Sequence, residues 1–138
     1  MDKQWKLYED LESILYSEAQ LKEAIVQLGE RITRDYQGKK PVMVCILKGA
    51  SVFFCDLIRQ IDLPLEIDFM VVSSYGSGTS SSGEVQLVKD LGRSVNGRDV
   101  IVVEDIVDSG TTLSYLKKVL DSRGVASLRI CSLLDKPA

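Results

Sequence analysis

Histidine is absent from all 138 residues of the chain. Its absence excludes catalytic triads and dyads in which an imidazole is the base, and it excludes every metal site with imidazole ligands. Acid–base chemistry must therefore rely on Asp, Glu, Lys or Tyr side chains. A metal ion held directly by the protein would take oxygen ligands, which favours an ion of the magnesium type.

Cysteine is scarce, and the three that occur, Cys45, Cys55 and Cys131, lie far apart. A metal site built on thiolates would show paired spacing such as C-x-x-C, and no such pair is present. Each cysteine has Val, Ile, Phe or Leu among its neighbours, which is typical of a buried thiol. We therefore predict three plain buried thiols.

A basic surplus is also missing, because 17 Lys and Arg stand against 20 Asp and Glu, a net charge of −3. General nucleic-acid binders usually carry such a surplus, so we expect no nucleic-acid partner. No apolar run approaches the ~20 residues that cross a bilayer, and residues 1–10 do not have the pattern of a signal peptide. These absences predict a cytoplasmic protein with no membrane partner.

What is present fits a globular domain, with 45% apolar and 27% charged residues. We expect one domain over residues 1–138 with a single hydrophobic core. Three helices are expected: one capped by Ser17 and ending near 36–38, one at 51–60, and one from 111 or 112 with Gly124 as its C-cap. Strands are expected at 42–47, 65–72, 85–88, 100–104 and 127–134, of which 85–88 is an edge strand. A loop at 73–84 and a turn at 96–97 connect them. This alternation predicts an α/β fold with a mostly parallel sheet flanked by helices.

Three polar segments follow predicted strands: Lys48–Gly49, the loop after Val72, and residues 104–112. Ligands of parallel α/β sheets bind outside the carboxyl ends of the strands, so we expect all three to face one crevice. The loop at 73–83 is polar and rich in Gly and Ser. Its simplest interpretation is a surface loop.

Two adjacent acids, Glu104 and Asp105, end the apolar strand at 100–104. Neighbouring carboxylates repel each other and need hydroxyls, a cation or water. The next segment, Asp108-Ser109-Gly110-Thr111-Thr112, sets one glycine and three hydroxyls before an apolar helix, which suits an anion cradle. The alternatives are a solvated turn for the acids and an ordinary N-cap turn for the loop. Neither a Walker A sequence nor G-x-G-x-x-G is present.

Residues 102–113, Val-Val-Glu-Asp-Ile-Val-Asp-Ser-Gly-Thr-Thr-Leu, resemble the signature with which type I phosphoribosyltransferases bind 5-phosphoribosyl 1-pyrophosphate (PRPP). The resemblance implies the phosphoribosyltransferase fold with a flexible loop over the active site. It implies that Asp108, Ser109, Gly110, Thr111 and Thr112 bind the 5-phosphate. It also implies that Glu104 and Asp105 bind the ribose and Mg²⁺, the ion through PRPP hydroxyls or water.

From about Ser17 onward the chain resembles the hypoxanthine–guanine phosphoribosyltransferases. That resemblance implies that Asp108 is the catalytic residue, acting as base or proton relay at purine N7, although it could also cap the following helix. Lys48 and Gly49 would bind pyrophosphate through backbone N–H groups, often at a non-proline cis peptide, together with Ser74 and Tyr75. Lys136 would donate a hydrogen bond to the O6 atom of a 6-oxopurine.

The function implied is purine salvage, with PRPP and hypoxanthine or guanine as substrates and IMP or GMP and pyrophosphate as products. A homo-oligomer, dimer or tetramer, is the family expectation. Such family members normally continue for a few dozen residues past the position of Ala138, so we expect a C-terminal segment of the base-binding hood to be missing. Three alternatives remain: a xanthine or guanine enzyme, an RNA-binding pyrimidine-operon regulator, and a non-catalytic module that binds PRPP or a nucleotide.

Overall fold

A computed structural model of the chain describes residues 17–74, 85–107 and 111–135. Its elements, in chain order, are α2 (Glu18–Asp35), β1 (Val42–Leu47), α3 (Ser51–Ile58), β2 (Glu66–Ser74), β3 (Val85–Lys89), β4 (Asp99–Val107), α4 (Thr111–Asp121) and β5 (Ser127–Asp135). Among these residues, no helix combines the length and the apolar character needed to span a bilayer.

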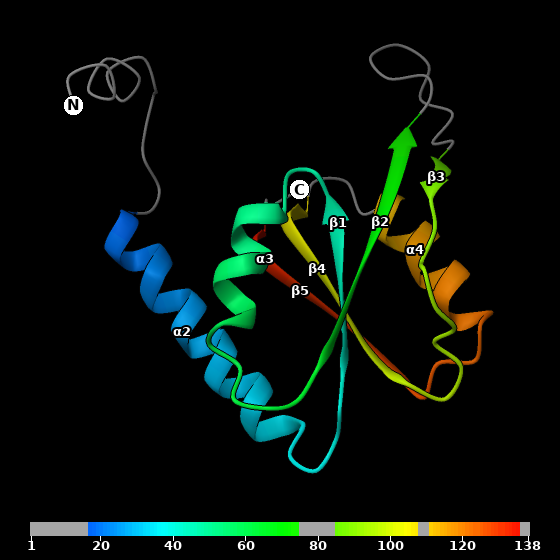
Figure 1. Cartoon of the computed structure of the whole chain (residues 1–138). Helices are drawn as coiled ribbons and strands as arrows, with labels where there is room; N and C mark the ends of the chain where they lie inside the picture. Colours follow the sequence, from blue (N-terminus) through cyan, green and yellow to red (C-terminus); the bar gives the residue numbers. More distant parts are fainter. Residues whose placement is uncertain (1–16, 75–84, 108–110, 136–138) are drawn as a thin grey trace, which may run out of the picture.

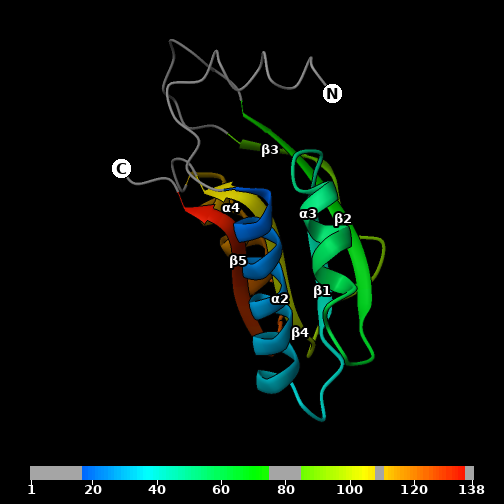
Figure 2. The ribbon, with the colours of Figure 1, turned by 90° about the vertical axis from the view of Figure 1, so that its left-hand side faces the viewer.

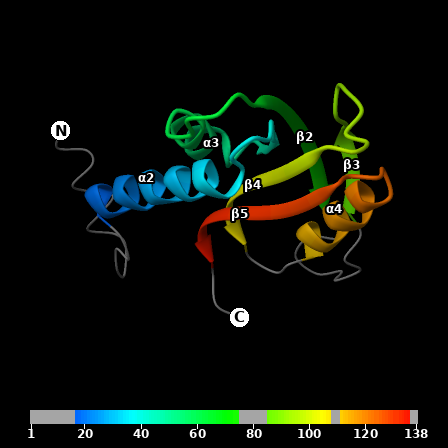
Figure 3. The ribbon, with the colours of Figure 1, turned by 90° about the horizontal axis from the view of Figure 1, so that it is seen from below.

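The five strands form one sheet in the order β3-β2-β1-β4-β5. Neighbouring strands are parallel except β3, which lies at one edge and runs antiparallel to β2. Helices α2 and α3 cover one face and α4 covers the other (Figures 1 and 2). Seen from below, α3 and α4 lie on opposite sides of β4 and β5 (Figure 3). The α/β fold with a mostly parallel sheet is therefore confirmed.

The first helix begins where its local sequence predicts. Ser17 Oγ accepts a hydrogen bond from Gln20 N at 3.1 Å, and Gln20 Oε1 accepts one from Ser17 N at 2.8 Å, which completes the capping box. The helix ends at Asp35, and its buried residues are Ile25, Gly29 and Ile32. These buried positions face α3 and the sheet, so one apolar stripe sets the orientation of α2.

The sheet separates two apolar clusters. The cluster beneath α2 and α3 includes Ile25, Ile32, Met43, Cys45, Phe53, Phe54, Leu57, Ile101 and Val103. The cluster beneath α4 includes Val42, Val44, Ile46, Met70, Val100, Val102, Leu116 and Leu120. Consecutive residues of β1 and β4 alternate between the two clusters, because successive side chains of a strand point to opposite faces. Burial of both faces explains the continuous apolar runs in these strands.

Some sequence-based boundaries were wrong. β4 continues past Glu104 to Val107, because β5 pairs with it as far as Val107↔Asp135. β2 extends through Ser73 and Ser74, which were expected in a loop, because they pair with Gln86 and Val85 of β3. These extensions come from partner strands that are distant in the sequence, so local composition could not predict them.

Two further details differ from expectation. Helix α3 ends at Ile58, two residues before the predicted end at position 60. Cys45 and Cys131 are buried as expected, but Cys55 is exposed. Cys55 lies on the outer side of α3, whose buried residues are Phe53, Phe54 and Leu57. The prediction of three buried thiols is therefore wrong for Cys55.

Candidate functional site

The carboxyl ends of β1 and β4 bring two predicted site segments into contact. A Cβ atom built on Gly49 would lie 2.9 Å from Asp105 Oδ2 and 3.5 Å from Asp105 Oδ1. The loop after β1 therefore passes directly beside the carboxylate of Asp105 in β4, and a side chain at position 49 would push that carboxylate away. This contact joins positions that are 56 residues apart, and it confirms that Lys48–Gly49 and the acidic end of β4 share one edge of the sheet.

The loop after β1 has an unusual backbone. The peptide bond between Leu47 and Lys48 is cis, as the family resemblance implies for this position. The carbonyl of Lys48 accepts hydrogen bonds from Ser51 N at 3.1 Å and from Ser51 Oγ at 2.9 Å. Ala50, the N-cap of α3, makes no side-chain capping hydrogen bond. The loop thus leads into α3, whose first turn is held by the two hydrogen bonds from Ser51 to the Lys48 carbonyl.

The two acids of β4 point to opposite faces of the sheet. Strand alternation places Glu104 on the face covered by α4, with Val102, and Asp105 on the face of the loop after β1, with Val103. Both are half-buried. Thr112, in the first turn of α4, is also half-buried. Asp105 therefore lies beside the loop after β1, and Glu104 lies on the side of the sheet that α4 covers.

Burial and charge both act on Glu104. Desolvation, followed by repulsion from Asp105, raises the pKa of Glu104 from 4.5 to about 7, against a smaller opposing hydrogen bond from the Asp105 backbone. Behind the site, burial first and then Cys55, Glu104 and Asp105 raise the pKa of the Cys45 thiol to about 11. Cys45 is therefore a neutral thiol at pH 7. A cation or hydrogen-bond donors near Glu104 would offset the cost of its half-buried negative charge.

Replacing Glu104 with glutamine should stabilise the protein at alkaline pH. The pKa of Glu104 is raised on folding, so its stabilising contribution is complete below pH 4.5 and is lost as pH rises through 7. Glutamine does not ionise, so Glu104→Gln should gain on the order of 1 kcal/mol at pH 8 after discounting for solvent, and little near pH 5. Thermal unfolding followed by circular dichroism at both pH values measures the difference.

Glu66→Gln is the matched control for that experiment. Hydrogen bonding from Arg98 is the main reason that the pKa of Glu66 is lowered, so this variant should be less stable than the parent at pH 8. Equal midpoints for Glu104→Gln and the parent at pH 8 would contradict the raised pKa.

The donor set at this edge fits Mg²⁺ that is shared with a substrate. The described residues contain no group of three or more His, Cys, Asp or Glu side chains that could enclose a metal ion. They do place two carboxylates, Glu104 and Asp105, at consecutive positions near the carboxyl end of β4, on opposite faces of the sheet. Mg²⁺ is commonly held by one or two carboxylates, with water and substrate phosphate completing its shell. The site therefore suits an ion that arrives with a phosphorylated ligand.

The structure describes only part of the predicted site. Lys48, Gly49, Glu104, Asp105 and Thr112 lie within the described residues, and Ser74 and Thr111 are described as backbone at the ends of β2 and α4. The predictions for Tyr75, Asp108, Ser109, Gly110 and Lys136 lie outside them.

One neighbour of the site was missed by the sequence analysis. Ser132 of β5 pairs with Glu104 in the parallel register. A serine inside an apolar strand carries no signal of its own. Only the pairing of β4 with β5 brings Ser132 to this position.

The model of the phosphoribosyl transferase domain family matches residues 11–138. The chain is 52% identical over 132 residues to the bifunctional protein TilS/HprT of Listeria monocytogenes, covering 96% of this chain and 20% of that protein. It is 49% identical over 131 residues to a hypoxanthine-guanine phosphoribosyltransferase of Streptococcus thermophilus, covering 95% of this chain and 73% of the relative. The chain thus spans about a fifth of the length of the bifunctional relatives.

Solved structures of phosphoribosyltransferases are also similar to this chain. A hypoxanthine phosphoribosyltransferase from Staphylococcus aureus matches with a TM-score of 0.89 at 50% identity, covering 96% of this chain and 72% of that one. A hypoxanthine-guanine phosphoribosyltransferase from Bacillus anthracis, with a HEPES molecule in the active site, matches with a TM-score of 0.85 at 44% identity, covering 93% and 76%.

Proposed function

Because this chain belongs to the phosphoribosyl transferase domain family, we propose that it transfers the 5-phosphoribosyl group of PRPP to hypoxanthine or guanine. The products would be IMP or GMP and pyrophosphate, which makes the reaction one of purine salvage. The observation that carries the proposal is the approach of Gly49 to Asp105, at 2.9 Å from a built Cβ to Oδ2. It supports one site in which a pyrophosphate loop and a ribose-binding acid meet.

The residues would divide the substrate between them. The segment from Asp108 to Thr112, at the N-terminus of α4, would bind the 5-phosphate. Glu104 and Asp105 would accept hydrogen bonds from the ribose hydroxyls. Lys48 and Gly49 would bind the pyrophosphate through backbone N–H groups, joined by Ser74 and Tyr75. Such binding would hold the reacting carbon of the ribose in place, and positioning of this kind lowers the barrier of a two-substrate reaction.

Two residues outside the described part of the chain would contact the purine. Lys136 would donate to O6, which favours 6-oxopurines, because the 6-amino group of adenine is itself a donor. Asp108 would hold or move the proton at N7 while N9 bonds to the ribose and pyrophosphate departs. Glu104 and Asp105 would hold Mg²⁺ through PRPP hydroxyls or water, and the bound ion would supply positive charge against the leaving pyrophosphate.

An absorbance assay with PRPP, Mg²⁺ and four purine bases tests the proposal. We expect turnover of hypoxanthine and guanine, and a rate with adenine that is lower by roughly 10⁴-fold, because an unmatched polar group is strongly rejected. Preference for xanthine would instead indicate the related xanthine or guanine enzyme. A folded sample that binds PRPP but turns over no base would indicate a binding module. Salt-dependent RNA binding would favour the regulator.

Three further predictions accompany this function. We infer a homo-oligomer, dimer or tetramer, a cytoplasmic location, and a single phosphoribosyltransferase domain over residues 1–138. Sedimentation analysis of the purified chain measures the oligomeric state.

A further inference from the structure

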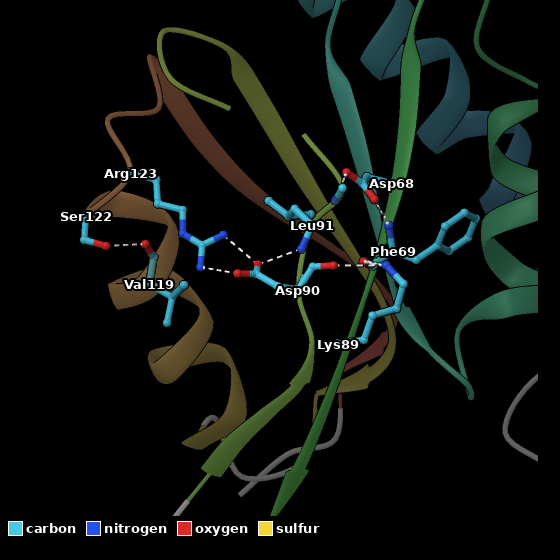
Figure 4. A network of polar contacts seen from close by, with 9 residues as sticks. Asp68, Phe69, Lys89, Asp90, Leu91, Val119, Ser122 and Arg123 are labelled. Atoms are coloured by element: carbon cyan, nitrogen blue, oxygen red, sulfur yellow. Dashed lines mark hydrogen bonds and ion pairs between the residues drawn. The ribbon is translucent and has the colours of Figure 1, made fainter. Parts of the chain in front are cut away.

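The end of β3 is tied to the turn after α4 by a two-point ion pair (Figure 4). Arg123 Nη1 lies 2.6 Å from Asp90 Oδ1, and Arg123 Nη2 lies 2.7 Å from Asp90 Oδ2. Asp90 directly follows β3, and Arg123 lies two residues after the end of α4. Paired hydrogen bonds of this kind define direction as well as distance, because the guanidinium fork matches the two carboxylate oxygens.

Asp90 is itself held firmly on the sheet. Its Oδ1 accepts a hydrogen bond from Leu91 N at 2.6 Å. Lys89 Nζ donates to the carbonyls of Phe69 at 3.1 Å and of Asp90 at 3.0 Å, and so bridges β2 and β3 where their register shifts. These contacts make Asp90 a defined point of attachment and not a freely moving surface carboxylate.

The segment after Asp90 is anchored to β2 as well. Asp68 accepts hydrogen bonds from Phe69 N at 2.8 Å and from Gly92 N at 2.9 Å. The chain that leaves β3 is thus fixed to β2 on both sides of Asp90. Arg123 is therefore bonded to a residue whose position is fixed by the sheet.

The ion pair contributes more to position than to stability. The side chains of Asp90 and Arg123 are 45% and 32% exposed, and pairs so exposed stabilise proteins little. Burial of Leu116 and Leu120, each 1% exposed or less, holds α4 on the sheet. Apolar contacts are not directional, so they define the axial position of the helix less sharply than the two hydrogen bonds from Arg123 do.

Helix α4 carries the effect of this attachment to the candidate site. It runs from Thr111 to Asp121, and its N-terminus directly follows the predicted phosphate loop. A helix of this length moves as a rigid rod, so an axial shift at its C-terminal end is transmitted to its first turn. Thr112 in that turn would move relative to Glu104 on β4, which belongs to the sheet.

We propose that Arg123 is a positioning residue whose two-point contact with Asp90 sets the axial position of α4. The contact would thereby set the spacing between the 5-phosphate site at the helix N-terminus and the ribose-binding acids of β4. This inference rests on the proposed function for its consequence in catalysis. Arg123 and Asp90 would thus act from the C-terminal end of α4, whereas the substrate would bind at its N-terminal end.

Arg123→Lys tests the proposal, because lysine keeps the charge and loses the fork. We expect the KM for PRPP to rise roughly fivefold to tenfold, with kcat within about twofold and the KM for hypoxanthine unchanged. A role in simple charge balance would leave all three constants at parental values. A role in general stability would lower the unfolding midpoint and the active fraction without changing the KM for PRPP.

Arg98→Lys is the matched control. Arg98 is 29% exposed and its Nη1 lies 2.8 Å from Glu66 Oε1, which makes an ion pair of similar length with a less exposed carboxylate, and it involves no part of α4. Its KM for PRPP should stay at the parental value. Asp90→Asn and Arg123→Gln complete a double-mutant cycle. If both act through one contact, the double variant should show no larger rise in KM than Arg123→Gln alone.

A ligand-free measurement separates this inference from the proposed function. The amide chemical shifts of Thr112 and Leu113 report the position of the first turn of α4 in the absence of substrate. They should change in Arg123→Lys and remain parental in Arg98→Lys. If the parent turned over no purine but these shifts changed, the proposed function would fail and the positioning role would stand. Parental shifts in Arg123→Lys, or an equal rise in KM in Arg98→Lys, would overturn the proposal.

Discussion

Replacing Gly29 with alanine should destabilise the protein by about 2 kcal/mol. A Cβ atom at this position of α2 would lie 2.4 Å from Gln60 Cβ, 2.7 Å from Gln60 O and 2.9 Å from Gln60 C. Two of these three atoms are backbone, so relief requires movement of a helix rather than of a side chain. Overpacking of this kind costs about 1–3 kcal/mol or more, and only about 1 kcal/mol is recovered from the better helix propensity of alanine.

The surroundings of Gly29 leave little freedom to adjust. Thr33 Oγ1 donates to Gly29 O at 2.8 Å and accepts from Asp62 N at 2.9 Å, which links α2 to the segment after α3. Gln60 N donates to Leu57 O at 2.9 Å. Hydrogen bonds therefore hold α2 and the segment after α3 together at the point where the new methyl group would enter.

Urea denaturation at pH 7 measures this prediction. Gly92→Ala is the control, because its Cβ would meet no atom closer than 3.8 Å, at Asp68 Oδ1. The control should unfold within about 0.5 kcal/mol of the parent, as surface substitutions usually do. A midpoint for Gly29→Ala equal to that of Gly92→Ala would show that α2 and α3 are less closely packed than the structure has them.

Replacing Gly49 with alanine should lower kcat/KM for PRPP on the order of 100-fold while the fold survives. The new Cβ would lie 2.9 Å from Asp105 Oδ2, so the carboxylate and the loop after β1 must move apart. A displacement of about 1 Å at a reacting centre can cost this much. Gly49 is exposed and is not among the glycines with positive φ, so alanine should be tolerated by the backbone itself.

Steady-state kinetics with varied PRPP, together with a thermal midpoint, measures the effect of Gly49→Ala. The midpoint should stay near the parental value, because the atoms that must move belong to an exposed loop and a half-buried side chain. Gly92→Ala again provides the control and should keep its parental kcat/KM. Activity within about twofold of the parent in Gly49→Ala would refute a shared site for Gly49 and Asp105.

Local features of this chain were predictable because their causes are local. Ser17 and Gln20 cap α2 within four residues of sequence, and Gly124 adopts a positive φ of 76° where a helix must stop. The apolar run of β1 likewise required burial on both faces. The identity of the acids at the end of β4 also needed no structure, because the motif that contains them is continuous.

Contacts between distant segments were decided by the tertiary structure alone. The extension of β4 to Val107 depends on β5, and the exposure of Cys55 depends on which side of α3 meets the sheet. The same is true of Arg123 and Asp90, which are 33 residues apart and form an ion pair only because α4 packs beside β3.

The acidic motif at residues 102–113, which begins inside β4, shows which properties of the site are local and which are not. Its sequence by itself determined the chemistry available, since carboxylates, hydroxyls and a glycine are fixed by residue type. Only the tertiary structure decided that Gly49 lies against Asp105, because chain register and strand order place the ends of β1 and β4 side by side. Side-chain chemistry is local, whereas the geometry of a site between strands comes from the packing of the whole sheet.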